Sequence, residues 1–446
     1  MDFLTFFSDF GTFASSIFAF IVALSIIVFV HEFGHYIVGR WCGVSAEIFS
    51  LGMGPVLWFR MDQRGTKWQV AVLPFGGYVK FAGDADVTSV GAQADMSDLI
   101  PKSTRHTLDG APLWARTLTV AAGPFFNFGF SILIFASFFM TAGIATDEAY
   151  VGKVKDLGQG VQTLQKGDLI LSIDGQPVLD LLDLYKIGDA LTPQRFISYQ
   201  LRRNGVLLDV VGPYPFPTYV DRVQPQSAAL AAGVHSHDLV VAVDGDPVFA
   251  FAQLVEKVKA GDGAPMELTL LRSGQELEVN LTPKQVDLPK ADGGFERRWL
   301  LGLSGGLAFD PLTRRTGPFE GVWLATKATY SLISKNLSGI GHLVTGKISS
   351  CNISGPIRIA QVSGDMARDG ALVFFGFVAM LSTAIGLMNL FPIPVLDGGH
   401  LVLFGYEALS RKKPSPKVIG ILMRIGMIVL LSLMAFAFTN DLIFCP

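Results

Sequence analysis

The first long apolar run of the chain carries three ionisable side chains near its end. Residues 17–30 are apolar except for Ser25, and His31, Glu32 and His35 follow within five positions. A charged group at bilayer depth costs about 2.5–3.5 kcal/mol on insertion scales, so such residues normally face a partner or a water-filled cavity. The run therefore predicts a transmembrane helix that uses these side chains for a function.

The spacing of the two histidines indicates a metal site. On a helix, His31 and His35 lie one turn apart on the same face. Two imidazoles at this spacing bind zinc, and Glu32 beside them is the general base of such sites. The same short pattern also occurs by chance in soluble helices, but an exposed helix face is excluded inside lipid. A catalytic zinc needs three protein ligands and an open position for water, so the third ligand must come from elsewhere.

Composition places the chain among membrane proteins with a substantial soluble portion. Of its 446 residues, 50% are hydrophobic and only 16% are charged, and the length predicts more than one structural unit. The net charge of −3 gives no reason to expect a nucleic-acid partner. Three cysteines are too few for a disulfide framework or a thiolate zinc site. No cleavable signal peptide is expected, because residues 1–9 contain no Lys or Arg.

Four apolar runs are long enough to cross a bilayer, which takes about 20 residues. We predict a polytopic α-helical membrane protein with spans at 10–38, 115–145, 371–391 and 418–440. Lys and Arg gather between the first two spans and between the last two, and cytoplasmic loops carry such an excess. Both connections, including the loop 84–114, are therefore expected on the cytoplasmic side. The termini and the large middle portion are then expected on the opposite side.

Residues 43–83 predict a membrane-associated β segment. Short apolar runs at 46–51, 55–59 and 68–73 read as strands separated by glycines. The segment is too rich in aromatic residues for a solvated loop. We expect a small sheet or hairpin against the membrane domain, and a separate cytoplasmic β-subdomain is the alternative.

The middle portion contains an internal repeat. Residues 167–178 match residues 237–248 at a constant offset of 70, and each copy predicts a buried strand followed by an Asp-Gly turn. The copies resemble PDZ domains, which would make 146–218 and 219–300 two tandem PDZ-like α+β domains. Such domains bind an extended peptide at a sheet edge. The alternative is that the grooves are empty and serve as spacers or size filters.

Residues 301–370 follow the repeat and are predicted to form a helical segment on the membrane surface. Between 318 and 348 the apolar residues recur at helical spacing among Lys and Asn. Ordinary packing against the second repeat would give the same pattern.

The third span ends in a stretch that offers the missing ligand. Asn389 is followed by Pro392, Pro394 and Asp397, and two glycines come directly after the carboxylate. Prolines end a helix, and irregular backbone at membrane depth is allowed only where protein or a cavity covers it. Asp397 is therefore the expected third ligand, and His400 is its rival. The Asn389 amide would hold substrate backbone or polarise its carbonyl, or else pack between helices.

Taken together, these motifs resemble the site-2 protease family of intramembrane zinc metalloproteases. The resemblance rests on five motifs that cover nearly the whole chain: His-Glu-Phe-Gly-His at 31–35, Leu-Gly-Met-Gly-Pro at 51–55, Pro-Phe-Gly-Gly-Tyr-Val at 74–79, Gly-Pro-Phe-Phe-Asn at 123–127 and Asn-Leu-Phe-Pro-Ile-Pro-Val-Leu-Asp-Gly-Gly at 389–399. It implies one Zn²⁺ per chain, held by His31, His35 and Asp397, with Glu32 as the catalytic acid/base. The candidate substrate-binding residues are Asn389, Pro392 and Pro394.

The resemblance also implies regulated intramembrane proteolysis. The expected substrates are single-span membrane proteins, such as an anti-sigma factor whose outer domain has been removed, and leftover signal peptides. The protein would be a multi-pass protein of the bacterial inner membrane, with its PDZ-like domains and both termini in the periplasm. Its active site would open toward the cytoplasm, because His35 lies near Arg40 at that end of the span.

Two other classes of protein would fit parts of the pattern. A membrane-tethered PDZ peptide-binding scaffold would carry a structural metal site, which is normally closed by four ligands, and His400 as a fourth ligand would favour it. A metal transporter would need further polar residues in the spans, and the second span offers little beyond Asn127.

Overall fold

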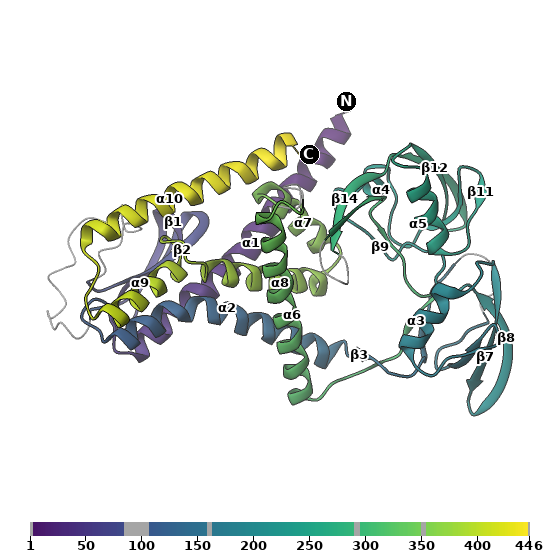
Figure 1. Ribbon diagram of the computed structural model, residues 1–446, viewed down its shortest axis with the longest axis horizontal. Coiled ribbons are helices and arrows are strands. Elements are labelled where there is room, and N and C mark those ends of the chain that lie inside the picture. The colour runs from purple at the N-terminus through teal and green to yellow at the C-terminus, as the bar shows by residue number, and fades with distance from the viewer. Residues whose placement is uncertain (1–2, 84–106, 158–162, 290–294, 349–353, 445–446) are drawn as a thin grey trace. The chain divides into compact units, whose positions relative to one another are not determined.

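The computed structural model describes residues 3–83, 107–157, 163–289, 295–348 and 354–444 (Figure 1). The chain forms two compact units. The helical unit comprises Met1–Phe138, Pro318–Val344 and Ser350–Pro446, and the β-rich unit comprises Phe139–Gly317 and Thr345–Ser349. Most of the predicted loop 84–114 lies outside the described residues.

Within the described residues, four helices of the helical unit are long and apolar enough to cross a membrane. They are α1 (Phe3–Trp41), α2 (Leu113–Thr141), α8 (Ala371–Asn389) and α10 (Pro416–Thr439). The second helix ends before the predicted boundary at 145. Gly143 takes a positive φ of 83° and ends the run, and Ile144–Ala145 form strand β3 instead.

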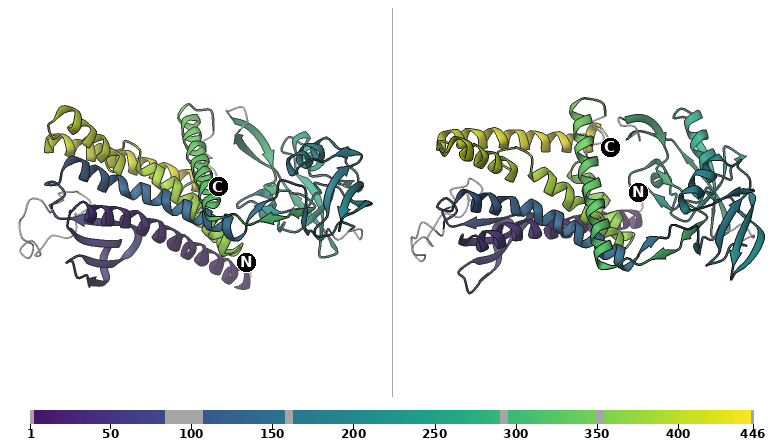
Figure 2. Two further views of the ribbon diagram at one scale, coloured as in Figure 1. Left: turned by 90° about the horizontal axis from the view of Figure 1, so that it is seen from below. Right: turned by 60° about the horizontal axis from the view of Figure 1, so that its bottom comes forward.

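The β segment is a hairpin of two long antiparallel strands, β1 (Ala46–Met61) and β2 (Lys67–Phe81), rather than three short ones. It lies against α1 (Figure 2). The first half of β1 pairs with both ends of β2. The hairpin therefore curls, and its two-stranded sheet is partly closed. Phe49 is buried between Tyr36 of α1 and Trp68 of β2, and these ring contacts anchor the hairpin to the helix.

Residues 301–317 differ from the prediction. The helical segment begins only at residue 318, with α6 (Pro318–Val344) and α7 (Pro356–Arg368). The residues before it form three short strands that pair with strands from earlier in the chain: β16 (Leu303–Ser304) with β9 (Arg222–Val223), β17 (Phe309–Pro311) with β4 (Val151–Val154), and β18 (Thr313–Arg314) with β3. The physical reason is burial, because Phe309 is only 1% exposed and packs in the core of the first sheet.

The β-rich unit holds two four-stranded antiparallel sheets with the orders β6-β5-β7-β8 and β11-β10-β12-β13. The first contains β5 (Leu169–Ile173), β6 (Gln176–Pro177), α3 (Leu181–Ala190), β7 (Phe196–Arg203) and β8 (Val206–Pro213). The second contains β10 (Leu239–Val243), β11 (Asp246–Pro247), α5 (Phe251–Ala260), β12 (Met266–Arg272) and β13 (Gln275–Leu281). Three further elements lie beside the second sheet: α4 (Ala228–Ala231), β14 (Lys284–Pro289) and β15 (Phe295–Leu300).

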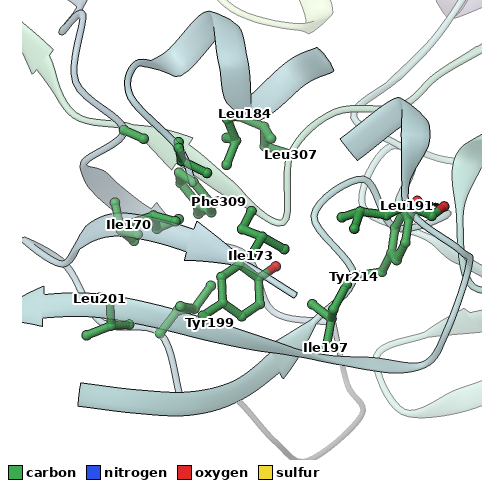
Figure 3. Packing of buried hydrophobic residues seen from close by; sticks show 14 of the residues in the cluster. Ile170, Ile173, Leu184, Leu191, Ile197, Tyr199, Leu201, Tyr214, Leu307 and Phe309 are labelled. Atoms are coloured by element: carbon green, nitrogen blue, oxygen red, sulfur yellow. Dashed lines mark hydrogen bonds between the residues drawn. The ribbon is translucent and has the colours of Figure 1, made fainter. Parts of the chain in front are cut away.

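The two sheets have the same kind of hairpin turn. Asp174 and Asp244 have φ values of 51° and 52° and each precedes a glycine, as the predicted hairpin turns require. The Asp168 carboxylate accepts two hydrogen bonds from Arg203 at 2.7 and 2.8 Å. In the first core, Tyr199 is buried among apolar side chains (Figure 3). Its hydroxyl donates to the Pro213 carbonyl at 2.6 Å.

Candidate metal centre

Three donor atoms from distant parts of the chain converge in the helical unit. His31 and His35 lie one turn apart on α1, and Asp397 is the first residue of helix α9 (Asp397–Ser410). The Asp397 Oδ2 atom lies 3.2 Å from His31 Nε2 and 3.5 Å from His35 Nε2, and the two Nε2 atoms are 3.2 Å apart. The fold thus brings a carboxylate that follows the third apolar helix next to the histidine pair of the first.

The turn before α9 explains how Asp397 reaches the histidines. Helix α8 ends at Asn389, and a series of tight turns closed by backbone hydrogen bonds, such as Leu396 N–H to the Ile393 carbonyl, leads into α9. A Cβ atom at Gly398 would lie 2.3 Å from the Leu390 carbonyl oxygen, and one at Gly399 would lie 2.4 Å from the Ile393 carbonyl oxygen. Only glycine allows this close approach of backbone to backbone, so the two glycines after the carboxylate hold the turn tight.

The arrangement fits a zinc ion. Zinc–ligand bonds of about 2.0–2.1 Å in tetrahedral geometry separate neighbouring ligand atoms by about 3.3 Å, close to the three distances here. Within the described part of the chain, the buried Asp397 Oδ2 atom has no hydrogen-bond donor, as expected of an oxygen that serves a cation. Among the described His, Cys, Asp and Glu residues, the group that could hold a metal ion consists of His31, His35 and Asp397. His400 is not part of it.

Glu32 lies between the donor group and the β hairpin. The backbone N–H of Val79 on β2 donates a hydrogen bond to the Glu32 carboxylate. A Cβ atom at Gly77 would lie 3.3 Å from the Glu32 Cγ atom and 2.8 Å from Val28. The glycine thus brings the β2 backbone close to α1 at the level of the metal centre.

Helix α2 forms a further wall of the centre. The Thr119 carbonyl oxygen lies 2.9 Å from His35 Nδ1, and the Asn127 side-chain amide lies 3.4 Å from His31 Nδ1. A Cβ atom at Gly123 would lie 2.3 Å from His35 Nε2. The sequence marks Gly123 and Asn127 as part of a motif, and Asn127 as a polar residue of the second span, but it indicates no contact of either with the histidines. Their spacing of four on one helix face was the available signal.

An ion pair far from the donors was not predicted. Arg116 at the start of α2 donates two hydrogen bonds to the Glu407 carboxylate on α9, at 2.6 and 3.0 Å. Its Nε atom also donates to the Ala111 carbonyl, and its guanidinium lies over the Phe404 ring. Arg116 is only 6% exposed. The pair joins residues 291 positions apart, and no local pattern predicts such a contact.

The candidate substrate-binding residues lie in the connection between α8 and α9. Asn389 is half-buried at the end of α8, and Pro392 is exposed. Pro394 packs against α10, where a Cβ atom at Gly426 would lie 3.1 Å from its Cδ atom. Pro394 therefore has a packing role whether or not it contacts substrate.

Two histidines and a carboxylate, brought together by helices apolar enough to cross a membrane, define a class: membrane-embedded metal-dependent hydrolases. The model of peptidase family M50 matches residues 19–433, and the chain belongs to this family. It is a zinc metalloprotease of the membrane, with Zn²⁺ as its cofactor.

Curated relatives agree with this assignment. The chain is 33% identical to regulator of sigma-E protease RseP of Salmonella typhimurium and 32% identical to that of Escherichia coli, each over 95% of this chain and 97% of the relative. It is 34% identical to a candidate zinc metalloprotease of Agrobacterium fabrum, over 95% of this chain and 94% of that one. Among solved structures, a solution structure from Geobacillus thermodenitrificans is 27% identical, and the match covers 17% of this chain and 84% of the other with a TM-score of 0.15.

Proposed function

We propose that His31, His35 and Asp397 bind the zinc ion, and that Glu32 is the general base that hydrolyses a peptide bond of a membrane-spanning substrate. The convergence of the three donor atoms within hydrogen-bonding distances carries the proposal. Bound zinc supplies a Lewis acid that polarises the peptide carbonyl and acidifies a water molecule. Glu32 takes the water proton and passes it to the leaving nitrogen.

The substrate must present extended backbone, because a helix hides its carbonyl groups in internal hydrogen bonds. The segment Gly77–Lys80 of β2 pairs with β1 on one side. It lies against Glu32, and we propose that its other side receives an unwound substrate strand, as in other β-addition complexes. Asn389, Pro392 and Pro394 would hold the substrate from the opposite side.

We further propose that the two sheets of the β-rich unit are PDZ-like domains spanning about 146–218 and 219–300. Their matching element order and their short paired strands support this. Beside α5 lies a pocket of about 430 Å³, bordered by Phe216, Phe251 and Val255, which is large enough for peptide side chains. The alternative role, a size filter that blocks folded domains, would use the same surfaces without a bound tail.

The names of the relatives suggest the biological setting. Two are called regulators of sigma-E protease, and we propose by similarity that this chain cuts single-span substrates of the anti-sigma-factor type and signal-peptide remnants. The Lys and Arg distribution supports a periplasmic β-rich unit and an active site that opens toward the cytoplasm.

The test uses the purified full-length protein in liposomes with a tagged single-span substrate. Glu32→Gln should retain zinc and lose cleavage by about 10²–10⁴-fold, the usual contribution of a general base. Asp397→Asn should lose both zinc and cleavage. Full cleavage by Glu32→Gln would refute the mechanism. If wild type and both variants bind the substrate equally and none cuts it, while substitutions in the groove abolish binding, the scaffold function is correct instead.

A further inference from the structure

Both ring nitrogens of each histidine face a polar group of another residue. Their Nε2 atoms face Asp397 and each other, at the donor group. Their Nδ1 atoms face helix α2: that of His35 lies 2.9 Å from the Thr119 carbonyl oxygen, and that of His31 lies 3.4 Å from the Asn127 amide. Helix α2 therefore supplies the groups that face the Nδ1 atoms of both histidines.

A histidine that binds metal through Nε2 must carry its hydrogen on Nδ1, because neutral imidazole has one hydrogen and one lone pair. Whatever faces Nδ1 must then accept a hydrogen bond. The Thr119 carbonyl can only accept, so it holds His35 in the metal-binding tautomer. The same requirement at His31 falls on Asn127, whose amide offers both a donor and an acceptor.

The Asn127 side chain is fully buried, and no group among the described residues donates a hydrogen bond to its Oδ1 atom. With Nδ2 toward His31, the amide would donate to Nδ1 and force the hydrogen onto Nε2, which then could not bind zinc. The oxygen and nitrogen of an amide are assigned from their partners. Rotating the amide by half a turn gives Oδ1 a donor, His31 Nδ1–H, and leaves the Nε2 lone pair free.

The backbone of Asn127 is held firmly at this place. Its carbonyl oxygen accepts hydrogen bonds from the Ser131 and Ser382 hydroxyls at 3.0 and 3.1 Å. A Cβ atom at Gly386 of α8 would lie 3.1 Å from the Asn127 Cβ atom, so the two helices touch there. The amide consequently has a defined position beside His31.

We propose that Asn127 is a positioning residue that accepts a hydrogen bond from His31 Nδ1–H through its amide oxygen, and so sets the tautomer and orientation of this zinc ligand. The proposal rests on the proposed zinc ligation by His31. It gives the motif at 123–127 a role, because Gly123 leaves room for the imidazoles and Asn127 orients one of them.

The experiment measures zinc affinity of the purified full-length protein by competition with a chelator, and the visible spectrum after Co²⁺ replaces zinc. Asn127→Leu keeps the branched heavy-atom skeleton but removes the acceptor, and should lower zinc affinity by about 10–100-fold, as loss of such partners does. Asn127→Asp can only accept, and should stay within about threefold of wild type with an unchanged Co²⁺ spectrum. Gly129→Ala, on the same helix, is the control: an added Cβ atom there meets nothing within 4 Å, so the variant should bind zinc like wild type.

The zinc affinities of these variants distinguish a positioning role of Asn127 from a packing role. Equal losses in the Leu and Asp variants would show a packing role only and overturn the proposal, as would unchanged affinity in Asn127→Leu. A merely structural defect would also lower the melting temperature of the zinc-free protein, which the proposal leaves unchanged. If wild type and His31→Ala bind zinc equally, the proposed ligand set fails, and Asn127 has no ligand to position.

Discussion

At the scale of single residues, the metal centre depends on the absence of side chains as much as on their presence. Gly123 lies where the two imidazoles meet, and a Cβ atom there would be 2.3 Å from His35 Nε2 and 2.8 Å from His31 Cε1. Real Cβ atoms do not approach so closely, so the histidines would have to leave their positions. The glycine is thus required by the site, although it binds nothing.

Gly123→Ala is accordingly expected to weaken zinc binding. Overpacking of this kind costs about 1–3 kcal/mol, which corresponds to roughly 5- to 150-fold in affinity. Gly129→Ala on the same helix is the matched control, because a Cβ atom there would meet nothing within 4 Å. Chelator competition should separate the two variants. Equal zinc affinity in both would contradict the close packing of α2 against the histidines.

At the scale of elements, helix α9 has to be held in place to present Asp397. Only two described residues of α9, Gly398 and Gly399, are buried, so apolar packing along the helix is slight. Its two ends carry ionic contacts instead, Asp397 with the histidines and Glu407 with Arg116. We infer that the second contact stops the far end of the helix from moving away from α2.

Glu407→Gln should therefore loosen α9 by about 3–5 kcal/mol, because it leaves the buried Arg116 charge unpaired. The measurements are hydrogen exchange of the α9 amides and zinc affinity, and both should change in the direction of a less firmly held Asp397. The double variant Arg116→Glu with Glu407→Arg should restore part of each. Lys413→Ala, which removes an exposed contact to the Asp109 carbonyl just beyond α9, should change neither. Unchanged exchange in Glu407→Gln would refute the role of the pair.

At the scale of the whole molecule, different interactions stabilise the two units. All three donor atoms of the metal centre belong to the helical unit, whereas the β-rich unit is held by apolar cores and by ion pairs such as Asp238 with Arg272. Metal removal should consequently act on the helical unit alone, whereas acid should also act on the ion pairs of the β-rich unit.

Removal of zinc with a chelator should abolish cleavage, and added zinc should restore it. Hydrogen exchange should rise at the start of α9 and around His31, because the cation that offsets the buried carboxylate is gone. Exchange in β5 and β10 should stay unchanged. Faster exchange throughout both sheets after chelation would show that the units are not independent in this respect.

Acid should act on the β-rich unit through Asp238. Burial opposes ionisation of this carboxyl group, but hydrogen bonds from the Arg272 side chain and the His235 backbone outweigh it and hold the pKa of Asp238 below its ordinary value. The carboxylate therefore stabilises the fold above about pH 4, the unfolded-state value, and this contribution is lost as the pH falls through the lower folded value.

Asp238→Asn should destabilise the β10 region by about 1.5–3 kcal/mol at neutral pH, the usual worth of a hydrogen bond to a charged group. Local opening free energies from hydrogen exchange, corrected for intrinsic rates, should show this gap between variant and wild type narrowing in strong acid. A gap that stayed constant to the lowest pH would mean that the ion pair is not its source.

Much of the site could be predicted because it depends on local geometry. His31 and His35 are neighbours on any helix, and Asp397 follows prolines that end a helix at membrane depth. The four spans, the β hairpin and the two Asp-Gly turns likewise follow from apolar length, glycine positions and period-two patterns.

Residues 303–314 could not be assigned in the same way. They pair with three separate strands from earlier in the chain, and short strands of two or three residues have no periodicity to detect.

The amino-acid sequence by itself thus determined the metal-binding residue types, their helical spacing and the membrane setting, because each is a property of one short segment. Only the tertiary structure decided which groups support them: the Thr119 carbonyl and the Asn127 amide behind the histidines, and Arg116 opposite Glu407. These contacts join different helices. They depend on how the helices pack, and many side-chain contacts together determine that packing. The spacing of a few residues therefore does not predict them.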